Sequence, residues 1–472
     1  MPQLAGQTEG LRFVHFVQTR AEADKIRATG QEVVSCLEEV VRDAVRSANP
    51  PKWQEPDDFR DVVGYDWSPI YADRHLPEFD AEVRDRVAGA LQQELERIFA
   101  KVRPDGFLSE PVALMPTHYC LYLCKKNGVR PLLWAGTFWP DHFYFVDQSD
   151  ISVPVRRKPL AEVSAESRQA IQSYVDRVVA DEAGPAYHHK FALTKQRPMD
   201  YFKQRAGTES LIYSEHWQAK LIQAARTGRS YVASKAFPAK FDYITAASAN
   251  EQMFYLKNLF GSRSRYNAPP QELSDDNIFF PLQFEPEASL LYSAPDFRDQ
   301  YALIEQLACA LPHGKVLWLK EHPNQFGVLA QKRWQDLRRR YANLRLVYGR
   351  ENGRELIKKC GLSVVITSQA GIESLLLGRR AIVFGSVFYR DFPGTIPVTS
   401  MSQAVTALGD AGNYGQIDVK DQIVASLDHM ARNSYPGRPH PSATLFSDEN
   451  LGKVARAIEA ELGVTGESGA SG

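Results

Sequence analysis

The feature that most limits the fold is a regular alternation of short apolar runs and helical patterns after residue 277. The apolar runs are 277–284, 315–320, 344–349, 362–367 and 379–385, and the helical stretches between them are 297–310, 329–341, 351–359 and 371–377. Strands that are apolar throughout are buried on both faces, and intervening helices allow the parallel crossovers that such a sheet needs. The pattern predicts a doubly wound parallel sheet of Rossmann type.

The first half of the chain shows the same kind of pattern less regularly. An apolar run at 11–18 predicts a strand, a helical stretch follows at 31–48, and 79–102 reads as a long amphipathic helix. The short strand in DGFLSEP, the helix 113–126 closed by Asn127-Gly128, and the strand RPLLWAG then form a parallel βαβ unit. A first Rossmann-like domain is therefore expected.

The middle of the chain differs from both halves. Residues 154–259 contain helical patterns and few strands, and between His188 and Arg265 thirteen Lys/Arg stand against five Asp/Glu. This stretch predicts a helical, basic insertion that can approach an anionic membrane surface. A solvated helical face explains the same charges equally well.

With 472 residues, the chain is long enough for two domains with appended segments. A final helix begins near Ser447 and places Leu451, Val454, Ile458 and Leu462 on one stripe. We expect an N-terminal Rossmann-like acceptor domain (1–150), the basic helical insertion (151–260), a linker (261–276), a C-terminal Rossmann-like donor-binding domain (277–440), a C-terminal helix (441–464) and a disordered tail (465–472).

Composition excludes several classes of protein. A formal net charge of −1 argues against wholesale nucleic-acid binding, and no apolar run reaches the length of a membrane span. The first residues lack the pattern of a signal peptide, and five scattered cysteines fit a reducing compartment. Cys120 and Cys124 share a helix face, but no further Cys or His completes a zinc site. We expect a cytoplasmic protein without a metal.

Polar residues follow four of the strands in the second half, where ligands of open α/β sheets bind. They are Gln283, Glu285 and Glu287 after the first strand, Lys320, His322 and Pro323 after the second, Ser368, Gln369, Gly371 and Glu373 after the fourth, and Tyr389 after the fifth. Each has an ordinary structural explanation as well: Ser368 can cap the next helix, and Glu373 can pair with Arg379 or Arg380. Together they predict a ligand site at this edge of the sheet.

These segments carry a family resemblance. The stretches FFPLQFEPEASLL, WLKEHP and TSQAGIESLLLGRRAIVFGSVFY resemble the capsule polysaccharide synthesis family, which includes retaining β-Kdo transferases. The family pattern is Gln-x-x-x-acid, Lys-x-His-Pro and Ser-x-x-Gly-x-Glu, and the match covers about 277–389. One departure is Glu287, because the family acid is usually Asp. The difference makes another donor sugar plausible.

The resemblance implies a GT-B-like, retaining glycosyltransferase that uses an activated sugar, CMP-Kdo by default or another such as phosphoribosyl diphosphate, and needs no metal or other cofactor. Lys320, His322 and the Ser368–Gly371 turn would bind the donor phosphate, and Glu373 its ribose hydroxyls. Glu287 would be the nucleophile, with Glu285 as second choice, and Gln283 would orient the sugar. A general base for the acceptor is expected from the other domain, either Glu110 or His118.

Two other functions stay open. Sugar-nucleotide 2-epimerases also use two such domains, but an epimerase leaves the basic insertion unexplained. A non-catalytic capsule export component predicts strand ends without a coherent site. The partners expected for the transferase are the donor, an oligosaccharide or glycolipid acceptor and an anionic inner-membrane surface, without nucleic acid.

Overall fold

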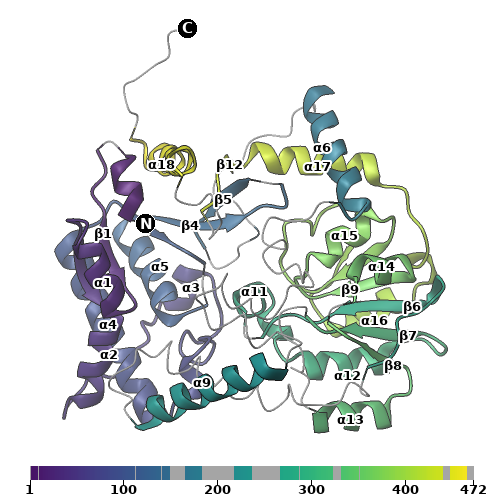
Figure 1. The fold of residues 1–472 in the computed structure, drawn as a ribbon, viewed down its shortest axis with the longest axis horizontal. Coiled ribbons are helices and arrows are strands. Elements are labelled where there is room, and N and C mark those ends of the chain that lie inside the picture. Colours follow the sequence, from purple (N-terminus) through teal and green to yellow (C-terminus); the bar gives the residue numbers. More distant parts are fainter. Residues whose placement is uncertain are drawn as a thin grey trace. The chain divides into compact units, whose positions relative to one another are not determined.

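The computed structural model describes residues 2–8, 10–111, 113–139, 141–148, 152, 165–182, 217–236, 266–285, 287–322, 331–349, 351–439 and 447–464. The contacts divide the chain into two units (Figure 1). Unit 1 comprises Met1–Pro159, Ser230–Asn250 and Met430–Gly472, and unit 2 comprises Leu160–Arg229 and Glu251–His429. Pro323, the expected tail and the start of the expected linker lie outside the described residues.

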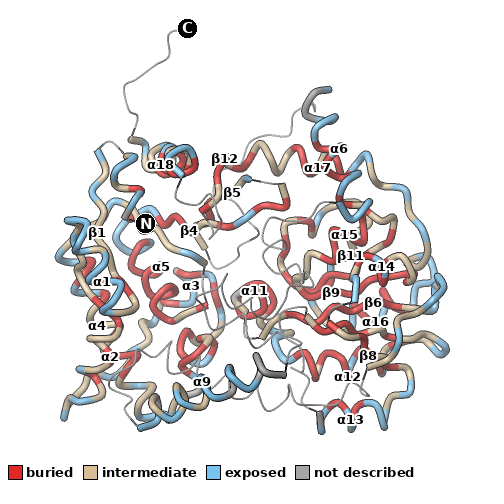
Figure 2. The backbone as a smooth tube through the Cα atoms, viewed as in Figure 1, coloured by how far each residue is buried: buried red, intermediate tan, exposed pale blue. Residues whose placement is uncertain are grey.

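Unit 2 is built on a six-stranded, entirely parallel sheet with the order β11-β10-β9-β6-β7-β8. Its strands are β6 (Ser274–Pro281), β7 (Val316–Lys320), β8 (Leu344–Val347), β9 (Cys360–Val365), β10 (Arg380–Val383) and β11 (Thr395–Pro397). All five expected strands are present, each within a few residues of its expected position, and β11 adds a sixth. The strand interiors are buried, as Figure 2 shows, because helices cover both faces.

The helices of unit 2 alternate with these strands. They are α6 (Ala165–Val179), α11 (Ala288–Ser293), α12 (Gln300–Ala310), α13 (Gln331–Arg340), α14 (Gly353–Lys358), α15 (Ala370–Leu376), α16 (Met401–Gly409) and α17 (Lys420–Arg432). The last three residues of α17 belong to unit 1. Two 3-10 turns lie at Pro295–Phe297 and Ala411–Asn413. Asp299 caps α12 by accepting from the N–H groups of Tyr301 and Ala302. The core joins Phe280, Leu319 and Trp334 across one face of the sheet.

Unit 1 contains two sheets. The smaller pairs β1 (Val14–Val17) with β2 (Glu32–Cys36), and the larger has the order β12-β5-β4-β3, from β3 (Gly106–Ser109), β4 (Arg130–Gly136), β5 (His142–Val146) and β12 (Tyr435–Pro436). β3 and β4 are parallel on either side of α5 (Met115–Asn127), which confirms the expected βαβ unit. The pairings of β5 with β4 and β12 are antiparallel, so this sheet is mixed.

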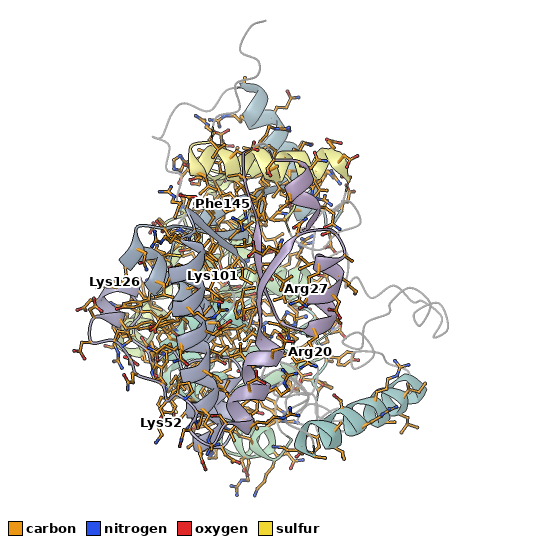
Figure 3. The ribbon with its side chains drawn as sticks, turned by 90° about the vertical axis from the view of Figure 1, so that its left-hand side faces the viewer. Arg20, Arg27, Lys52, Lys101, Lys126 and Phe145 are labelled. Atoms are coloured by element: carbon orange, nitrogen blue, oxygen red, sulfur yellow. The ribbon has the colours of Figure 1, made fainter. Side chains whose placement is uncertain are left out.

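The other helices of unit 1 pack around these strands. They are α1 (Arg20–Arg27), α2 (Leu37–Arg46), α3 (Phe59–Val63), α4 (Ala81–Val102) and α18 (Asp448–Leu462), with 3-10 turns at Pro2–Gly6 and Leu76–Glu78. Figure 3 looks onto this unit: Arg27 and Lys101 are exposed on α1 and α4, whereas Phe145 lies in the core. The expected helix 31–48 was wrong in its first turn, because Glu32–Cys36 pair with β1 as a strand.

The chain end returns to unit 1. β12 pairs with β5, and Leu451, Val454 and Ile458 of α18 pack with Phe143 and Phe145. The expected apolar stripe of this helix is therefore buried in the domain at the other end of the sequence.

The expected α/β class is confirmed: unit 2 is built on a doubly wound parallel sheet with inserted helices, and unit 1 combines a parallel βαβ unit with antiparallel strands. The GT-B-like arrangement of two Rossmann-type domains stays a prediction. Two helices of the expected insertion are described, α6 and α9 (Trp217–Ala236), and α6 packs against α15 within unit 2. The rest of the insertion lies outside the described residues.

Candidate functional site at the switch point of unit 2

The order of the strands marks one crevice in unit 2. From β6 the chain adds β7 and β8 on one side, and it then crosses over to add β9, β10 and β11 on the other side. Ligands of doubly wound sheets bind beyond the carboxyl ends of the strands where this direction reverses. In unit 2 that place lies between the ends of β6 and β9, next to Gln283 and Thr367.

The residues after β6 are held by the Gln300 side chain, which we call the Gln300 clamp and which was not predicted from the sequence. The Gln300 side chain accepts from the Gln283 N–H at 2.7 Å, and its amide donates to the Gln283 carbonyl at 3.2 Å and to the Glu285 carboxylate at 2.5 Å. Gln300 is buried at the start of α12, so the clamp is shielded from water. It fixes both the backbone and one carboxylate at the edge of the crevice.

Glu285 and Glu287 occupy different environments. Burial raises the pKa of Glu285 to about 7, with the Gln300 hydrogen bond opposing the shift and Asp299 adding to it. Glu287 is half-buried at the N-terminus of α11, where its carbonyl accepts from the N–H groups of Leu290 and Leu291. Both residues are half-buried, and the Glu285 carboxyl is suited to hold a proton near neutral pH.

After β7, the two expected phosphate ligands lie in different places. The Lys320 ammonium is buried and donates to the carbonyls of Gly349 at 2.6 Å and Glu321 at 3.3 Å. Burial lowers the pKa of Lys320 to about 8, against the opposing effect of Glu373 and other carboxylates. The Lys320 ammonium thus bonds two carbonyl groups of the protein, and its expected contact with a phosphate stays a prediction. His322 is half-buried and meets Phe284 edge-on, with 5.7 Å between the ring centroids.

The turn after β9 is also built differently from the expectation. The N–H groups of Ala370 and Gly371 bond Ser368, and the Tyr389 hydroxyl donates to the Ser368 carbonyl. A Cβ on Gly371 would lie 2.4 Å from the Tyr389 hydroxyl, so the glycine makes room for this ring. Gly371 and Tyr389 thus shape the turn, and two N–H groups expected to face a phosphate are used within it.

Glu373 belongs to a buried charge network. Arg354 donates to its carboxylate at 3.0 and 3.1 Å and also to Asp181 at 2.7 Å. The pairing expected with Arg379 or Arg380 is replaced by Arg354, another residue missed from the sequence. Burial raises the pKa of Glu373, and Arg354 opposes that shift. Asp181 follows α6, so the network ties the inserted helix to the edge of the sheet.

The two expected general bases lie in unit 1. Glu110 directly follows β3, and its carbonyl accepts from the Ser109 hydroxyl. His118 is buried in α5 and stacks on Tyr65 with 4.5 Å between ring centroids. Burial lowers the pKa of His118 to about 3, so the imidazole stays neutral inside the unit. Its position is that of a core residue and does not favour contact with an acceptor.

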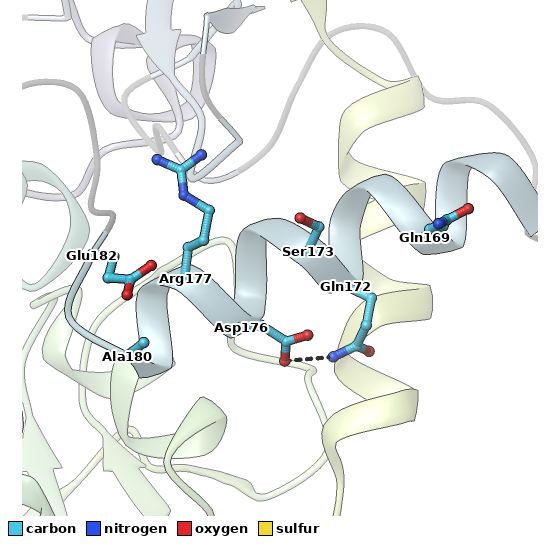
Figure 4. A pocket seen from close by; sticks show the side chains of 7 residues that line it. All are labelled: Gln169, Gln172, Ser173, Asp176, Arg177, Ala180 and Glu182. Atoms are coloured by element: carbon cyan, nitrogen blue, oxygen red, sulfur yellow. Dashed lines mark hydrogen bonds between the residues drawn. The ribbon is translucent and has the colours of Figure 1, made fainter.

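A second hollow runs along α6 and holds none of the expected site residues (Figure 4). Asp176, one of its lining residues, accepts from Gln172 and Lys420. Within the described residues no group of three or more His, Cys, Asp or Glu could hold a metal ion. Among the helices described, none has the length and apolar composition of a membrane span.

Comparison with known protein families finds one family model that matches part of unit 2. Residues 266–395 match the model of the capsule polysaccharide biosynthesis protein family. The resemblance expected from the sequence is confirmed over this segment. The matched segment ends at the first residue of β11 and contains every residue expected to bind the donor. A search of curated proteins finds no significant match.

Solved structures with some likeness include three sugar-active proteins. KpsC, a β-Kdo 2,7 transferase of Thermosulfurimonas dismutans, is 11% identical with a TM-score of 0.31 and covers 71% of this chain and 80% of its own. The kitacinnamycin glycotransferase is 11% identical with a TM-score of 0.27, covering 98% and 93%. A UDP-GlcNAc 2-epimerase of Methanocaldococcus jannaschii is 11% identical with a TM-score of 0.23, covering 88% and 99%. Similarity this low leaves the site itself as the basis for function.

Proposed function

We propose that the chain is a glycosyltransferase that moves a sugar from an activated donor to a growing cell-surface polysaccharide or glycolipid. The observation that carries the proposal is the coincidence of the family segment with the switch-point crevice. Gln283, which begins the Gln-x-x-x-acid pattern, and Glu285, which lies two residues later, are held by Gln300 at that crevice. A site preorganised in this way can orient a reacting group.

For a retaining reaction we propose that Glu287 is the nucleophile and that Glu285 holds a proton. A carboxylate that attacks the anomeric carbon must be ionised, and a pKa near 7 disfavours this for Glu285. Incubation with donor alone, followed by mass spectrometry and peptide mapping, would reveal a sugar adduct. An adduct on Glu285, or full turnover by Glu287→Gln, contradicts this assignment.

Phosphate recognition is then assigned to His322, and Lys320 stabilises the site from the interior. No metal is required in this proposal. The donor is CMP-Kdo or another activated sugar such as phosphoribosyl diphosphate. His322→Ala should lower transfer roughly ten- to a hundredfold at subsaturating donor, the loss of one charge-assisted contact.

We further propose that the protein works in the cytoplasm at the inner-membrane surface. All five cysteines are free, as in a reducing compartment. Helix α9 contains Lys220, Arg226, Arg229 and Lys235 and no acidic residue, while Leu221, Ile222 and Val232 on it are 41–63% exposed. Apolar side chains flanked by cations suit an interfacial helix on anionic lipid, where a lipid-linked acceptor would be found.

The deciding experiment incubates the full chain with CMP-Kdo, phosphoribosyl diphosphate and a panel of nucleotide sugars, with and without oligosaccharide acceptor. A transferase gives a product that contains both donor sugar and acceptor. An epimerase changes the sugar nucleotide without acceptor, and an export component leaves every donor intact. Either of the last two outcomes would remove the proposal.

A further inference from the structure

Four polar atoms around the switch-point crevice are buried and have no hydrogen-bond partner among the residues that the structure describes. They are the Gln283 amide nitrogen, the Ser293 and Thr367 hydroxyls and the Gln369 amide oxygen. Gln283 and Ser293 are themselves only 7% and 8% exposed. A buried polar group without a partner destabilises the fold, so several such groups in one place require a reason.

These atoms belong to segments that meet at one edge of the sheet. β6 and β9 are parallel neighbours, so the segment that follows β6, with Gln283, and the segment that follows β9, with Thr367 and Gln369, leave the sheet at the same edge. The Ser386 N–H donates to the Ser293 carbonyl at 2.7 Å. A Cβ on the adjacent Gly385 would lie 2.4 Å from the Thr367 methyl and 3.0 Å from Ala294. The ends of β6, β9, β10 and α11 are therefore packed together.

The hydrogen-bonding capacity of the four atoms indicates which part of an activated sugar, the phosphate or the sugar ring, they could bind. The set comprises one obligate donor, one obligate acceptor and two hydroxyls that can do either. A phosphate only accepts, so it would leave the Gln369 oxygen unpaired. The nearby cations are already engaged, Lys320 by two carbonyls and Arg354 by two carboxylates. A sugar ring offers hydroxyls that both donate and accept, and it brings no charge.

We infer that this set of four unpaired groups is the subsite for the hydroxyl-bearing sugar ring of the activated donor, and that phosphate binds elsewhere. The inference rests on the proposed function, and it adds Ser293 and Thr367 as residues that select the sugar. Both hydroxyls then stay unpaired until the ligand arrives.

The first test needs no ligand. Thr367→Val and Ser293→Ala remove hydroxyls without partners, so the melting temperature should stay unchanged or rise. The matched control is Ser374→Ala, because the Ser374 hydroxyl is buried and bonds both Ser363 at 2.7 Å and the Ala370 carbonyl at 2.6 Å. Its melting temperature should fall. A fall of the same size in Thr367→Val would overturn the inference.

The second test measures binding by calorimetry with CMP-Kdo, phosphoribosyl diphosphate and pyrophosphate, without acceptor. At least one sugar-bearing donor should bind, and Thr367→Val and Ser293→Ala should each weaken it roughly five- to tenfold, while Ser374→Ala should not. Pyrophosphate should bind more weakly and equally to all variants. Unchanged donor binding in Thr367→Val, or no binding of either donor, would overturn the inference. If the variants weaken donor binding but the wild type transfers no sugar, only the proposed function fails.

Discussion

At the residue scale, Glu285 shows how burial and function are linked. Burial of its carboxyl raises the pKa from 4.5 to about 7, although the hydrogen bond from Gln300 opposes this shift. The folded chain therefore holds this proton more tightly than the unfolded chain does. Between about pH 4.5 and 7 the contribution of Glu285 to stability must fall as pH rises, because the unfolded state releases the proton first.

The variant Glu285→Gln should remove this dependence. Relative to the wild type it should gain stability as pH rises from 5 to 8, by on the order of 1–3 kcal/mol. Urea unfolding at both pH values measures the gain, and Asp410→Asn on the exposed cap before Ala411–Asn413 is the control. A difference from the wild type that is equal at pH 5 and 8 would contradict the raised pKa.

Arg354 gives a second residue-scale prediction. Its buried guanidinium is bonded to Glu373 and Asp181, so Arg354→Met leaves a buried carboxylate unpaired. We expect a loss of roughly 3–5 kcal/mol in the free energy of unfolding. Adding Glu373→Gln should restore a large part of it, since the orphaned charge is removed. Losses that simply add in the double variant would show that the two residues are not coupled.

At the scale of the element, α9 carries the membrane proposal. Its exposed apolar residues lie among cations, so sedimentation with anionic liposomes should exceed that with neutral ones and fall with salt. Reversing two charges, Arg226→Glu with Arg229→Glu, should abolish binding, while Lys315→Glu in unit 2 should not. Binding that ignores lipid charge and salt would count decisively against a lipid-docking helix.

At the scale of the whole molecule, the return of α18 makes unit 1 depend on the chain end. Ile458 is 2% exposed in the core shared with Phe143 and Phe145. Ile458→Ala should cost about 2–5 kcal/mol, while Arg456→Ala on the exposed face of the same helix should cost little. Limited proteolysis should cleave unit 1 of the Ile458 variant first and spare unit 2. Equal sensitivity of both units would contradict this division.

The sequence pattern by itself determined that unit 2 contains a doubly wound parallel sheet. Its strands are apolar on both faces and its helices have a clear period, so five of the six strands of the sheet could be located, and only the short β11 was not expected. Polar residues at the strand ends indicated the edge where a ligand would bind. The same reasoning was wrong at Glu32–Cys36, because a strand of that length is distinguished from a helical turn only by its partner β1. The mixed pairing of β5 was equally invisible.

Only the tertiary structure decided how the polar residues are used. Sequence spacing placed Lys320, Gly371 and Tyr389 at strand ends, but whether a side chain there meets a ligand or a carbonyl depends on segments far away in the chain. The Lys320 ammonium donates to the Gly349 carbonyl, the Arg354 guanidinium donates to the Glu373 carboxylate, and the Gln300 amide donates to the Glu285 carboxylate. Hydrogen bonds and ion pairs act over a few ångströms in space whatever the separation in sequence, and for that reason these partners required the fold.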